Sequence, residues 1–303
     1  MNIRDLEYVV AVSEERHFGR AAVRCHISQP ALSGQIRKLE ASLGVALFER
    51  TNRIVQVTPV GEQIVAQARR LITISDEIVA TAQNARDPFS GQFRLGIIPT
   101  VGPYLSPLIL TEISRGLPNL ALTLVEGLTP DLMKRLANGD LDGAILATEL
   151  EDPHLKEIVL YDEPFWVALS ENHPLAAHET VDLGELSPEE LLLLADGHCL
   201  RDQVVDACQA KTGINNANTR ETSLETLFAL VAAGDGVTLA PALTNRNGSR
   251  QSSTIVMRRE RSGTAGRTVR LAIRVSYPRA ELADRLASIV RAKVPASLVT
   301  VAN

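Results

Sequence analysis

The sequence has little cysteine and few aromatic residues: among 303 residues, three are Cys and one is Trp. Three cysteines are too few for a disulfide-stapled fold, so we expect a compartment that keeps thiols reduced. No CxxC pair or His-x-x-x-His cluster occurs, which argues against zinc, and we expect no metal or cofactor. No window approaches 18 uninterrupted apolar residues, so we expect neither a membrane-spanning helix nor a membrane partner. Charges within the first seven residues argue against a signal peptide, so we expect a cytoplasmic protein.

Charge is unevenly distributed along the chain. The net charge is −5, which by itself disfavours a nucleic-acid partner. Residues 16–53, however, carry seven basic and two acidic side chains, whereas residues 71–303 carry 21 basic and 29 acidic ones. A basic N-terminal segment on an acidic body is typical of a nucleic-acid-binding protein, and the average charge hides it.

The first 58 residues predict a winged helix-turn-helix. A turn over 23–27 leads to Ser28, a good N-cap, and to Pro30, which a first helical turn tolerates. Apolar residues then recur at helical spacing and predict one buried face: Leu32, Ile36, Leu39 and Leu43. The opposite face is polar: Gln29, Ser33, Arg37 and Lys38. Two short strands, 48–50 and 55–58, would form the wing, with Arg50 and Arg53 near its tip.

A long helix follows, from Thr58-Pro59 as N-cap and first residue to about residue 86. Its apolar and small positions repeat like a heptad: Ile64, Ala68, Leu71, Ser75, Ile78 and Ala82, with Val65, Ile72 and Val79 beside them. This pattern predicts pairing with a second copy, although an amphipathic helix packed within one chain remains the alternative. The stretch 87–91 contains Pro and Gly and ends the helix as a linker.

From residue 92 onward, apolar strands alternate with helical stretches, which favours parallel α/β layers in two subdomains with a cleft between them. The expected strands are 92–98, 120–126, 143–147, 157–169, 190–195, 218–222, 236–240 and 267–275. The expected helices are 104–115, 129–138, 199–210, 223–233 and 279–293. Residues 244–266 are rich in Asn, Gly, Ser and Arg, and we expect a mobile loop there.

Several of these stretches resemble the LysR-type transcriptional regulators: RDLEY (4–8), SQPALS (28–33), LFER (47–50), TPVG (58–61) and VAAGDGVTLAP (231–241). The resemblance implies a winged helix-turn-helix at 1–58, a linker helix for dimerisation at 59–87 and an effector domain at 88–303. That α/β effector domain would be of the periplasmic-binding-protein type, with one subdomain at about 88–162 and 268–303 and the other at about 163–267.

Two further stretches, GIIPTVGPYL (96–105) and DGHCLRDQ (196–203), resemble the peroxide-sensing branch of that family. The resemblance implies that hydrogen peroxide oxidises Cys199 to a sulfenic acid, which then forms a disulfide with Cys208. It also implies a peroxide pocket made by five residues: Thr100, Thr129, His198, Asp202 and Arg267. The expected partners are double-stranded DNA, RNA polymerase, a thiol reductant system and further copies of the chain, as homodimer or homotetramer, and the protein would not be an enzyme.

The two cysteines can also be considered without the resemblance. Cys199 follows an Asp-Gly turn and would lie at a helix N-terminus, where backbone N–H groups stabilise a thiolate. If 199–208 is helical, nine positions separate the thiols by roughly 13 Å along the axis. A disulfide requires Cα atoms within about 7 Å, so it could form only if the helix melts. The spacing therefore predicts an oxidation-driven local refolding.

The predicted recognition helix and wing suggest how DNA is contacted. Gln29, Ser33 and Arg37 project from the helix and could reach base edges, while Pro30 shapes its entry. Arg50 and Arg53 suit phosphate or minor-groove contacts, which position the protein but do not specify sequence. A dimer predicts an operator with two-fold related halves.

Each candidate residue has a simpler interpretation. Thr100 and Thr129 could cap helices, and Arg267 could be a solvated charge at the edge of a loop. Cys25 is best explained as a small core residue of the helix-turn-helix. Three other functions also remain open: a regulator that binds a metabolite in the cleft, a thiol peroxidase that uses Cys199, and a solute-binding protein formed by 91–303.

Overall fold

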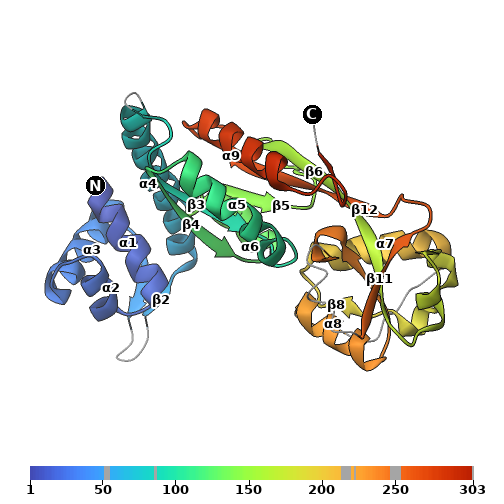
Figure 1. Ribbon diagram of the computed structural model, residues 1–303. Coiled ribbons are helices and arrows are strands. Elements are labelled where there is room, and N and C mark those ends of the chain that lie inside the picture. Colours follow the sequence, from blue (N-terminus) through green and yellow to red (C-terminus); the bar gives the residue numbers. More distant parts are fainter. Residues whose placement is uncertain (51–54, 85–86, 213–219, 222, 246–253, 302–303) are drawn as a thin grey trace. The chain divides into compact units, whose positions relative to one another are not determined.

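The computed structural model describes residues 1–50, 55–84, 87–212, 220–221, 223–245 and 254–301 (Figure 1). These residues form two compact units. The first is Met1–Asp87 together with Asn138–Asp140, and the second is Pro88–Ala137 with Leu141–Asn303. In the described part of the chain, no helix combines the length and the apolar character that crossing a membrane requires.

The first unit contains a three-helix core, a β-hairpin and a long helix. Its elements are α1 (Ile3–Glu15), α2 (Phe18–Arg24), α3 (Gln29–Leu43), β1 (Phe48–Arg50), β2 (Val55–Val57) and α4 (Pro59–Asn84). Two predicted caps are confirmed: the Ser28 side chain accepts from the N–H of Ala31, and the Thr58 hydroxyl accepts from the N–H of Gly61 at 3.0 Å. The strands β1 and β2 pair antiparallel, as a wing requires.

The turn between α2 and α3 is closed by backbone hydrogen bonds. The N–H of His26 donates to the carbonyl of Val23 at 3.1 Å, and that of Ile27 donates to Ala22 at 3.0 Å. His26 has a φ of 55°, in the left-handed region that usually ends a helix at glycine. This turn fixes the direction in which α3 leaves the core.

The predicted inner face of α3 is confirmed at three of its four positions. Leu32, Ile36 and Leu39 are buried in the core of the first unit, with Val9, Val12 and Phe18 among their neighbours in that cluster. The prediction for Leu43 is wrong, because its side chain is 39% exposed. Leu43 is the last residue of the helix, directly before the left-handed Gly44, so its side chain passes the end of the core.

The heptad-like apolar stripe predicted for α4, called the seam below, has two different halves. Near its N-terminus, Val65 and Ala68 are buried, and Ala68 clusters with Leu6 and Val10 of α1. Farther along the helix the large apolar side chains are exposed: Leu71, Ile74, Ile78 and Val79. Packing within one chain therefore accounts for the first half of the seam and leaves the second half uncovered in the monomer.

The second unit begins with a sheet whose order is β4-β3-β5-β12-β6. The strands are β3 (Gly91–Ile97), β4 (Leu120–Glu126), β5 (Gly143–Leu146), β6 (Leu155–Ser170) and β12 (Gly266–Arg274), and β13 (Thr300–Val301) also pairs with β6. β3 runs parallel to β4 and β5, but β12 is antiparallel to both β5 and β6. The expectation of parallel layers is thus correct for β3, β4 and β5 and wrong for β6 and β12, which connect the two halves of the unit as long antiparallel strands.

The second half of this unit is built on the C-terminal part of β6. Its strands are β7 (Thr180–Val181), β8 (Leu193–Leu194), β9 (Arg220–Glu221), β10 (Thr238–Pro241) and β11 (Ile255–Glu260). β10 and β11 pair antiparallel with β6, and β11 pairs parallel with β7. The strand expected at 190–195 is shortened to Leu193–Leu194 by a 3₁₀ turn at Pro188–Glu190, and further 3₁₀ turns lie at Pro174–Ala177, Leu183–Glu185 and Ala242–Asn245.

The stretch 244–266 was expected to contain a mobile loop, and no strand was predicted within it. Residues 255–260 form β11, which is held between β6 and β7. Residues 246–253, which carry most of the Ser of this stretch, lie outside the described residues, so the expected loop is not tested there.

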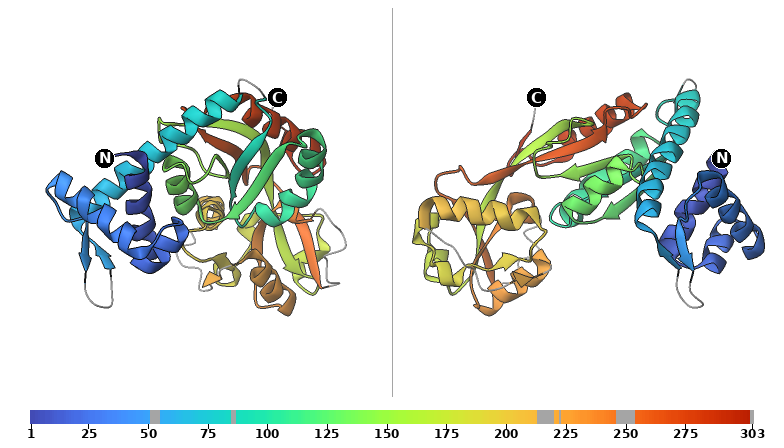
Figure 2. Two further views of the ribbon diagram at one scale, coloured as in Figure 1. Left: turned by 90° about the vertical axis from the view of Figure 1, so that its left-hand side faces the viewer. Right: turned by 180° about the vertical axis from the view of Figure 1, so that it is seen from behind.

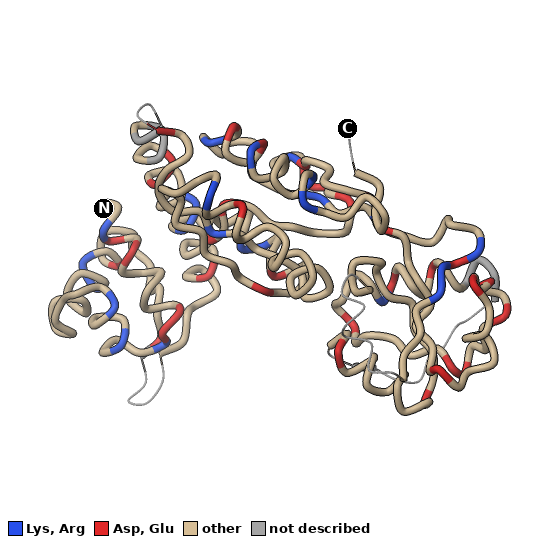
Figure 3. Tube along the Cα trace, in the orientation of Figure 1, with Lys and Arg blue, Asp and Glu red and all other residues tan. Residues whose placement is uncertain are grey.

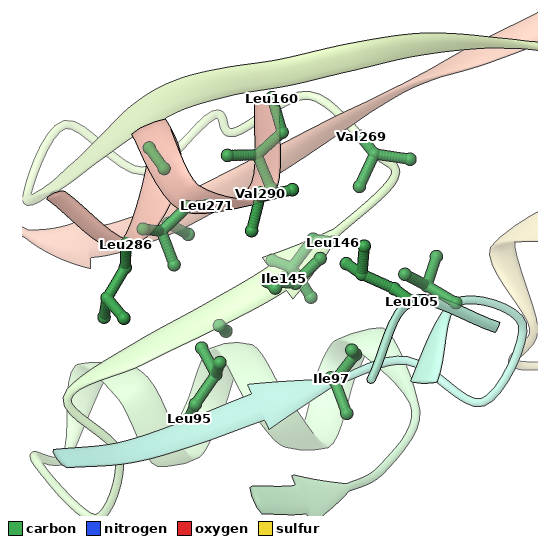
Figure 4. Close-up of a cluster of buried hydrophobic side chains, with 14 of the residues drawn as sticks. Leu95, Ile97, Leu105, Ile145, Leu146, Leu160, Val269, Leu271, Leu286 and Val290 are labelled. Carbon is green, nitrogen blue, oxygen red and sulfur yellow. The ribbon is translucent and has the colours of Figure 1, made fainter. Parts of the chain in front are cut away.

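The helices of the second unit match the predicted ranges to within two residues. They are α5 (Gly102–Gly116), α6 (Thr129–Ala137), α7 (Cys199–Thr212), α8 (Leu224–Ala233) and α9 (Ala280–Lys293). Two separate hydrophobic cores result. The first lies between the first sheet and α5, α6 and α9, and Figure 4 shows Leu95, Ile145 and Leu286 among its side chains. The second lies around the C-terminal half of β6, α7 and α8. Figure 2 shows the backbone of the chain from two further sides.

Candidate functional site

The α7 helix begins with Cys199, as predicted. An Asp196-Gly197 turn precedes it, and Gly197 has a φ of 95°, which glycine adopts without strain. A Cβ on Gly197 would lie 3.2 Å from a methyl carbon of Leu128, so the turn packs closely against the residue before α6. Cys199 is partly buried, at the helix N-terminus where backbone N–H groups favour an anion.

Cys199 and Cys208 lie in one continuous helix and contact different cores. Nine positions at about 100° each place the two side chains roughly half a turn apart around the axis. Cys199 accordingly packs against the first core, whereas Cys208 is fully buried in the second. Burial raises the pKa of the Cys208 thiol to about 11, so this group is protonated in the folded protein. Neither residue is in a disulfide.

Arg267 lies at the centre of a buried polar network rather than at a solvated loop edge. Its Nε donates to Glu163 at 2.9 Å, and both side chains are 1% exposed. Its Nη1 donates to the Thr100 hydroxyl at 2.8 Å, and its Nη2 donates to the Thr100 carbonyl at 3.0 Å. The other oxygen of Glu163 accepts the N–H of Leu243 at 2.9 Å. The positive charge of Arg267 is thus compensated by a carboxylate, which the sequence did not predict.

Neither threonine acts as the helix cap that the simpler interpretation proposed. α5 begins after Val101, which makes no side-chain capping bond, and the Thr100 hydroxyl is engaged by Arg267. α6 begins at Thr129 itself, and the N–H of Leu132 bonds to the carbonyl of Leu128. The Thr129 hydroxyl is buried without a hydrogen-bond partner in the described structure. Such a group is costly unless a bound polar molecule satisfies it.

The two remaining residues that were expected in the peroxide pocket differ in burial. His198 is buried directly before Cys199, whereas Asp202, in the first turn of α7, is exposed. Gln203 was not predicted: its side-chain amide donates to the carbonyl of Ala147, which follows β5, and thereby ties α7 to the first sheet. The described contacts thus form two groups, Thr100 with Arg267 and Glu163, and the Thr129 segment with the turn before Cys199.

Glu163 is a candidate site residue that the sequence did not predict. It faces Arg267 directly in the β12–β6 register. The available signal was an acidic residue within a strand otherwise expected to be buried, since such a charge requires a partner. Its partner is 104 positions away in the sequence, and periodicity could not identify it.

The face of α3 expected to contact DNA is open. Gln29, Pro30 and Arg37 are exposed and Ser33 is partly buried. Arg37 has no acidic partner among the described residues, whereas Arg20 pairs with Glu15 and Arg24 with Glu14. Figure 3 shows that acidic residues lie among the basic ones in this unit. The ion pairs of Arg20 and Arg24 make the unpaired cations fewer than the charge count suggests.

The wing residues can be placed only in part. Arg50 is the last residue of β1, and Arg53 lies outside the described residues. Cys25 is partly buried against the core of the first unit, and burial raises the pKa of its thiol. This position fits the interpretation of Cys25 as a small core residue.

Comparison with known protein families assigns both parts of the chain to one family. The model for bacterial regulatory helix-turn-helix proteins of the lysR family matches residues 3–62, and the model for the LysR substrate binding domain matches residues 86–295. The chain belongs to the LysR family. As a LysR-family member it is a DNA-binding transcriptional regulator and not an enzyme, with a winged helix-turn-helix and a C-terminal substrate-binding domain.

Individual relatives agree over nearly the whole chain. The hydrogen peroxide-inducible genes activator of Pectobacterium carotovorum subsp. carotovorum is 43% identical over 300 residues, covering 96% of both proteins. The DNA-binding transcriptional dual regulator OxyR of Escherichia coli (strain K12) is 43% identical over 303 residues, 97% of this chain and 96% of that protein. A full-length OxyR cysteine variant from Pseudomonas aeruginosa superposes with a TM-score of 0.83 at 37% identity, covering 100% of this LysR-family chain and 99% of that one.

A second solved structure carries a ligand. It is a cysteine variant of Corynebacterium glutamicum OxyR with bound hydrogen peroxide, and it matches with a TM-score of 0.65 at 36% identity. The match covers 96% of this chain and 92% of that one.

Proposed function

We propose that this LysR-family regulator senses hydrogen peroxide through Cys199 and Cys208 and transmits the signal by refolding α7. The observation that carries the proposal is the placement of the two thiols, half a turn apart on one helix and packed against two different cores. The name of the Pectobacterium relative, a hydrogen peroxide-inducible genes activator, supports the choice of peroxide as the signal, as does the hydrogen peroxide bound in the Corynebacterium glutamicum OxyR variant.

The chemistry proceeds in two balanced steps. The Cys199 thiolate attacks one oxygen of hydrogen peroxide, the O–O bond breaks, and a sulfenic acid and hydroxide form. The Cys208 thiol then attacks the sulfenic sulfur, so that an S–S bond forms and water leaves. The second step requires Cys208 to leave the second core and part of α7 to unwind, because helical geometry holds the thiols roughly 13 Å apart.

The pocket around the first step is assigned to Thr100, Thr129, His198, Asp202 and Arg267. The unsatisfied, buried Thr129 hydroxyl supports a polar ligand there. Arg267 occupies one acceptor site of the Thr100 hydroxyl, which leaves the hydroxyl proton available to a peroxide oxygen. Arg267 itself acts with Glu163 as a neutral pair that positions Thr100.

The output is a change in DNA binding and in contact with RNA polymerase. Gln29, Ser33 and Arg37 would read base edges, with Pro30 at the helix entry and Arg50 and Arg53 on the backbone. The exposed apolar side chains in the second half of α4 support pairing with a second copy, and hence a two-fold related operator. Pairs of dimers would give a tetramer, and a cytoplasmic thiol reductant would reset the disulfide.

A direct test combines peptide mapping with hydrogen exchange. The reduced protein is treated with one equivalent of hydrogen peroxide, and we expect a Cys199–Cys208 disulfide together with loss of amide protection in α7. The Cys208→Ser variant should form the sulfenic acid and keep α7 protected. A disulfide formed while α7 stays protected would contradict the refolding mechanism. If both thiols remain reduced, the chain responds to another signal, such as a metabolite in the cleft.

A further inference from the structure

A cavity lies in the second unit, apart from the two cysteines of α7. Its volume is about 270 Å³, and it is bounded by β6 at 164–166, by β11, and by the C-terminal segment 296–300. Ligand sites in proteins run from roughly 300 Å³ upward, so this cavity suits only a small molecule. No residue of the proposed peroxide pocket lines it.

The cavity combines one cation with an apolar wall. The Arg259 guanidinium lies 5.3 Å from the centre of the Trp166 ring. This stacking holds the cation at the cavity without neutralising it. Arg259 is exposed, and within the described residues no carboxylate pairs with it. Pro164, Trp166 and Leu298 supply apolar lining beside it.

Glu260, the acidic residue of the lining, is hydrogen-bonded to a residue outside the lining. The Glu260 carboxylate is buried and accepts from the N–H of Ser262 at 2.8 Å and from its hydroxyl at 2.7 Å. Both oxygens of the Glu260 carboxylate are thus engaged by Ser262. The cavity therefore presents a positive charge next to an apolar surface.

We propose that this cavity binds a small aromatic carboxylate. The carboxylate pairs with Arg259, which is suited to bidentate recognition of such a group, and the ring packs on Trp166, Pro164 and Leu298. An inorganic anion would leave the apolar wall unused, and a neutral ring would leave Arg259 without an anionic partner. This inference does not depend on the proposed redox function.

The location gives such binding a mechanical consequence. Residue 164 is the last position of β6 that pairs with β12, and 165 is the first that pairs with β10. β6 thus changes partners where the cavity lies, between the two subdomain cores. A ligand there contacts β6, β11 and the C-terminal segment at once and would restrain the strand that joins the subdomains.

The test uses Trp166, the single tryptophan of the chain, because its side chain lines this cavity. The reduced full-length protein is titrated with phenylacetate and, separately, with phenylacetamide, its neutral analogue. We expect a saturable change in emission with phenylacetate, with a dissociation constant of about 1 mM or below, and at least about tenfold weaker binding of the amide.

Two arginine variants complete the test. Arg259→Gln should weaken phenylacetate binding by at least about tenfold. Arg261→Gln removes the same charge two residues away, outside the cavity lining, and should bind as the parent does. Circular dichroism checks that both exposed-site variants fold. Absence of saturable binding, equal binding of acid and amide, or an equal effect of the two variants would each overturn the proposal.

Discussion

Arg267 and Glu163 are direct partners across the β12–β6 ladder, and both side chains are 1% exposed. The pair joins the two long strands close to where they enter the second subdomain. Through Arg267 it also holds Thr100, and through Glu163 it holds the backbone at Leu243. One buried ion pair therefore connects β6 and β12, the strands that join the two subdomains, to the loop before α5.

Removing one partner of the Arg267–Glu163 pair should lower the free energy of unfolding far more than breaking a surface ion pair does. Glu163→Gln or Arg267→Gln leaves an uncompensated buried charge, so we expect a loss of about 3–5 kcal/mol in the free energy of unfolding. Arg261→Ala breaks exposed pairs with Asp182 and Glu185 and should cost about 1 kcal/mol or less. Denaturant unfolding measures all three. Equal costs for the buried and exposed variants would contradict the role assigned to the pair.

The buried Cys208 thiol predicts a loss of stability at high pH. Burial raises its pKa in the folded state to about 11 from an ordinary value of 9.0. Between these values the unfolded chain releases the proton and the folded chain keeps it, so stability falls as pH rises. The contribution is fully present below pH 9. Comparing the parent with Cys208→Ala under reducing conditions isolates it, and an identical slope from pH 9 to 11 would refute the prediction.

The exposed face of α3 predicts which residues affect DNA affinity. Gln29→Ala and Arg37→Ala should each weaken operator binding by about 1–3 kcal/mol if they contact base edges. If Arg37 contacts a phosphate instead, its loss should weaken binding to all sequences alike and lower the salt dependence. Arg115→Ala, an exposed arginine of the second unit, is the charge-matched control. Fluorescence anisotropy at several salt concentrations separates these outcomes.

The uncovered half of α4 predicts an assembly contact. Ile78 is 67% exposed, and a carboxylate at this position should weaken any pairing through the helix. We expect Ile78→Glu to shift the oligomer toward monomer in sedimentation velocity. Val23→Glu changes a similarly exposed apolar residue, at 76%, on α2 and should leave the assembly unchanged. A parent protein that is already monomeric at micromolar concentration would contradict the proposed pairing.

The helices and long strands were predictable because their signals are local. Ser28 and Thr58 cap the helices that follow them, and apolar runs identified most strands to within two residues. Strand β11 was missed because Asn- and Ser-rich sequence precedes it and its partners, β6 and β7, are distant in the chain. Strand direction also depends on which strands meet, which periodicity does not encode.

The site was predictable only as far as single residues carry a signal. Cys199, Cys208 and the helix between them follow from spacing and a turn. The pairing of Arg267 with Glu163, and hence the compensation of its charge, arises from a tertiary contact between strands. Leu43 shows that a local signal can also mislead. Its helical spacing matched the buried face of α3, but the core ends before it and its side chain is exposed.

The α7 helix has a consequence for the reduction potential of the proposed disulfide. Whatever free energy the intact helix and the buried Cys208 contribute to the reduced state is lost on oxidation, so it favours return to the dithiol. For a two-electron couple, about 1.4 kcal/mol of such stabilisation raises the potential by about 30 mV. Substitutions along α7 that alter its stability, without touching either sulfur, should therefore tune the peroxide dose at which the regulator stays oxidised.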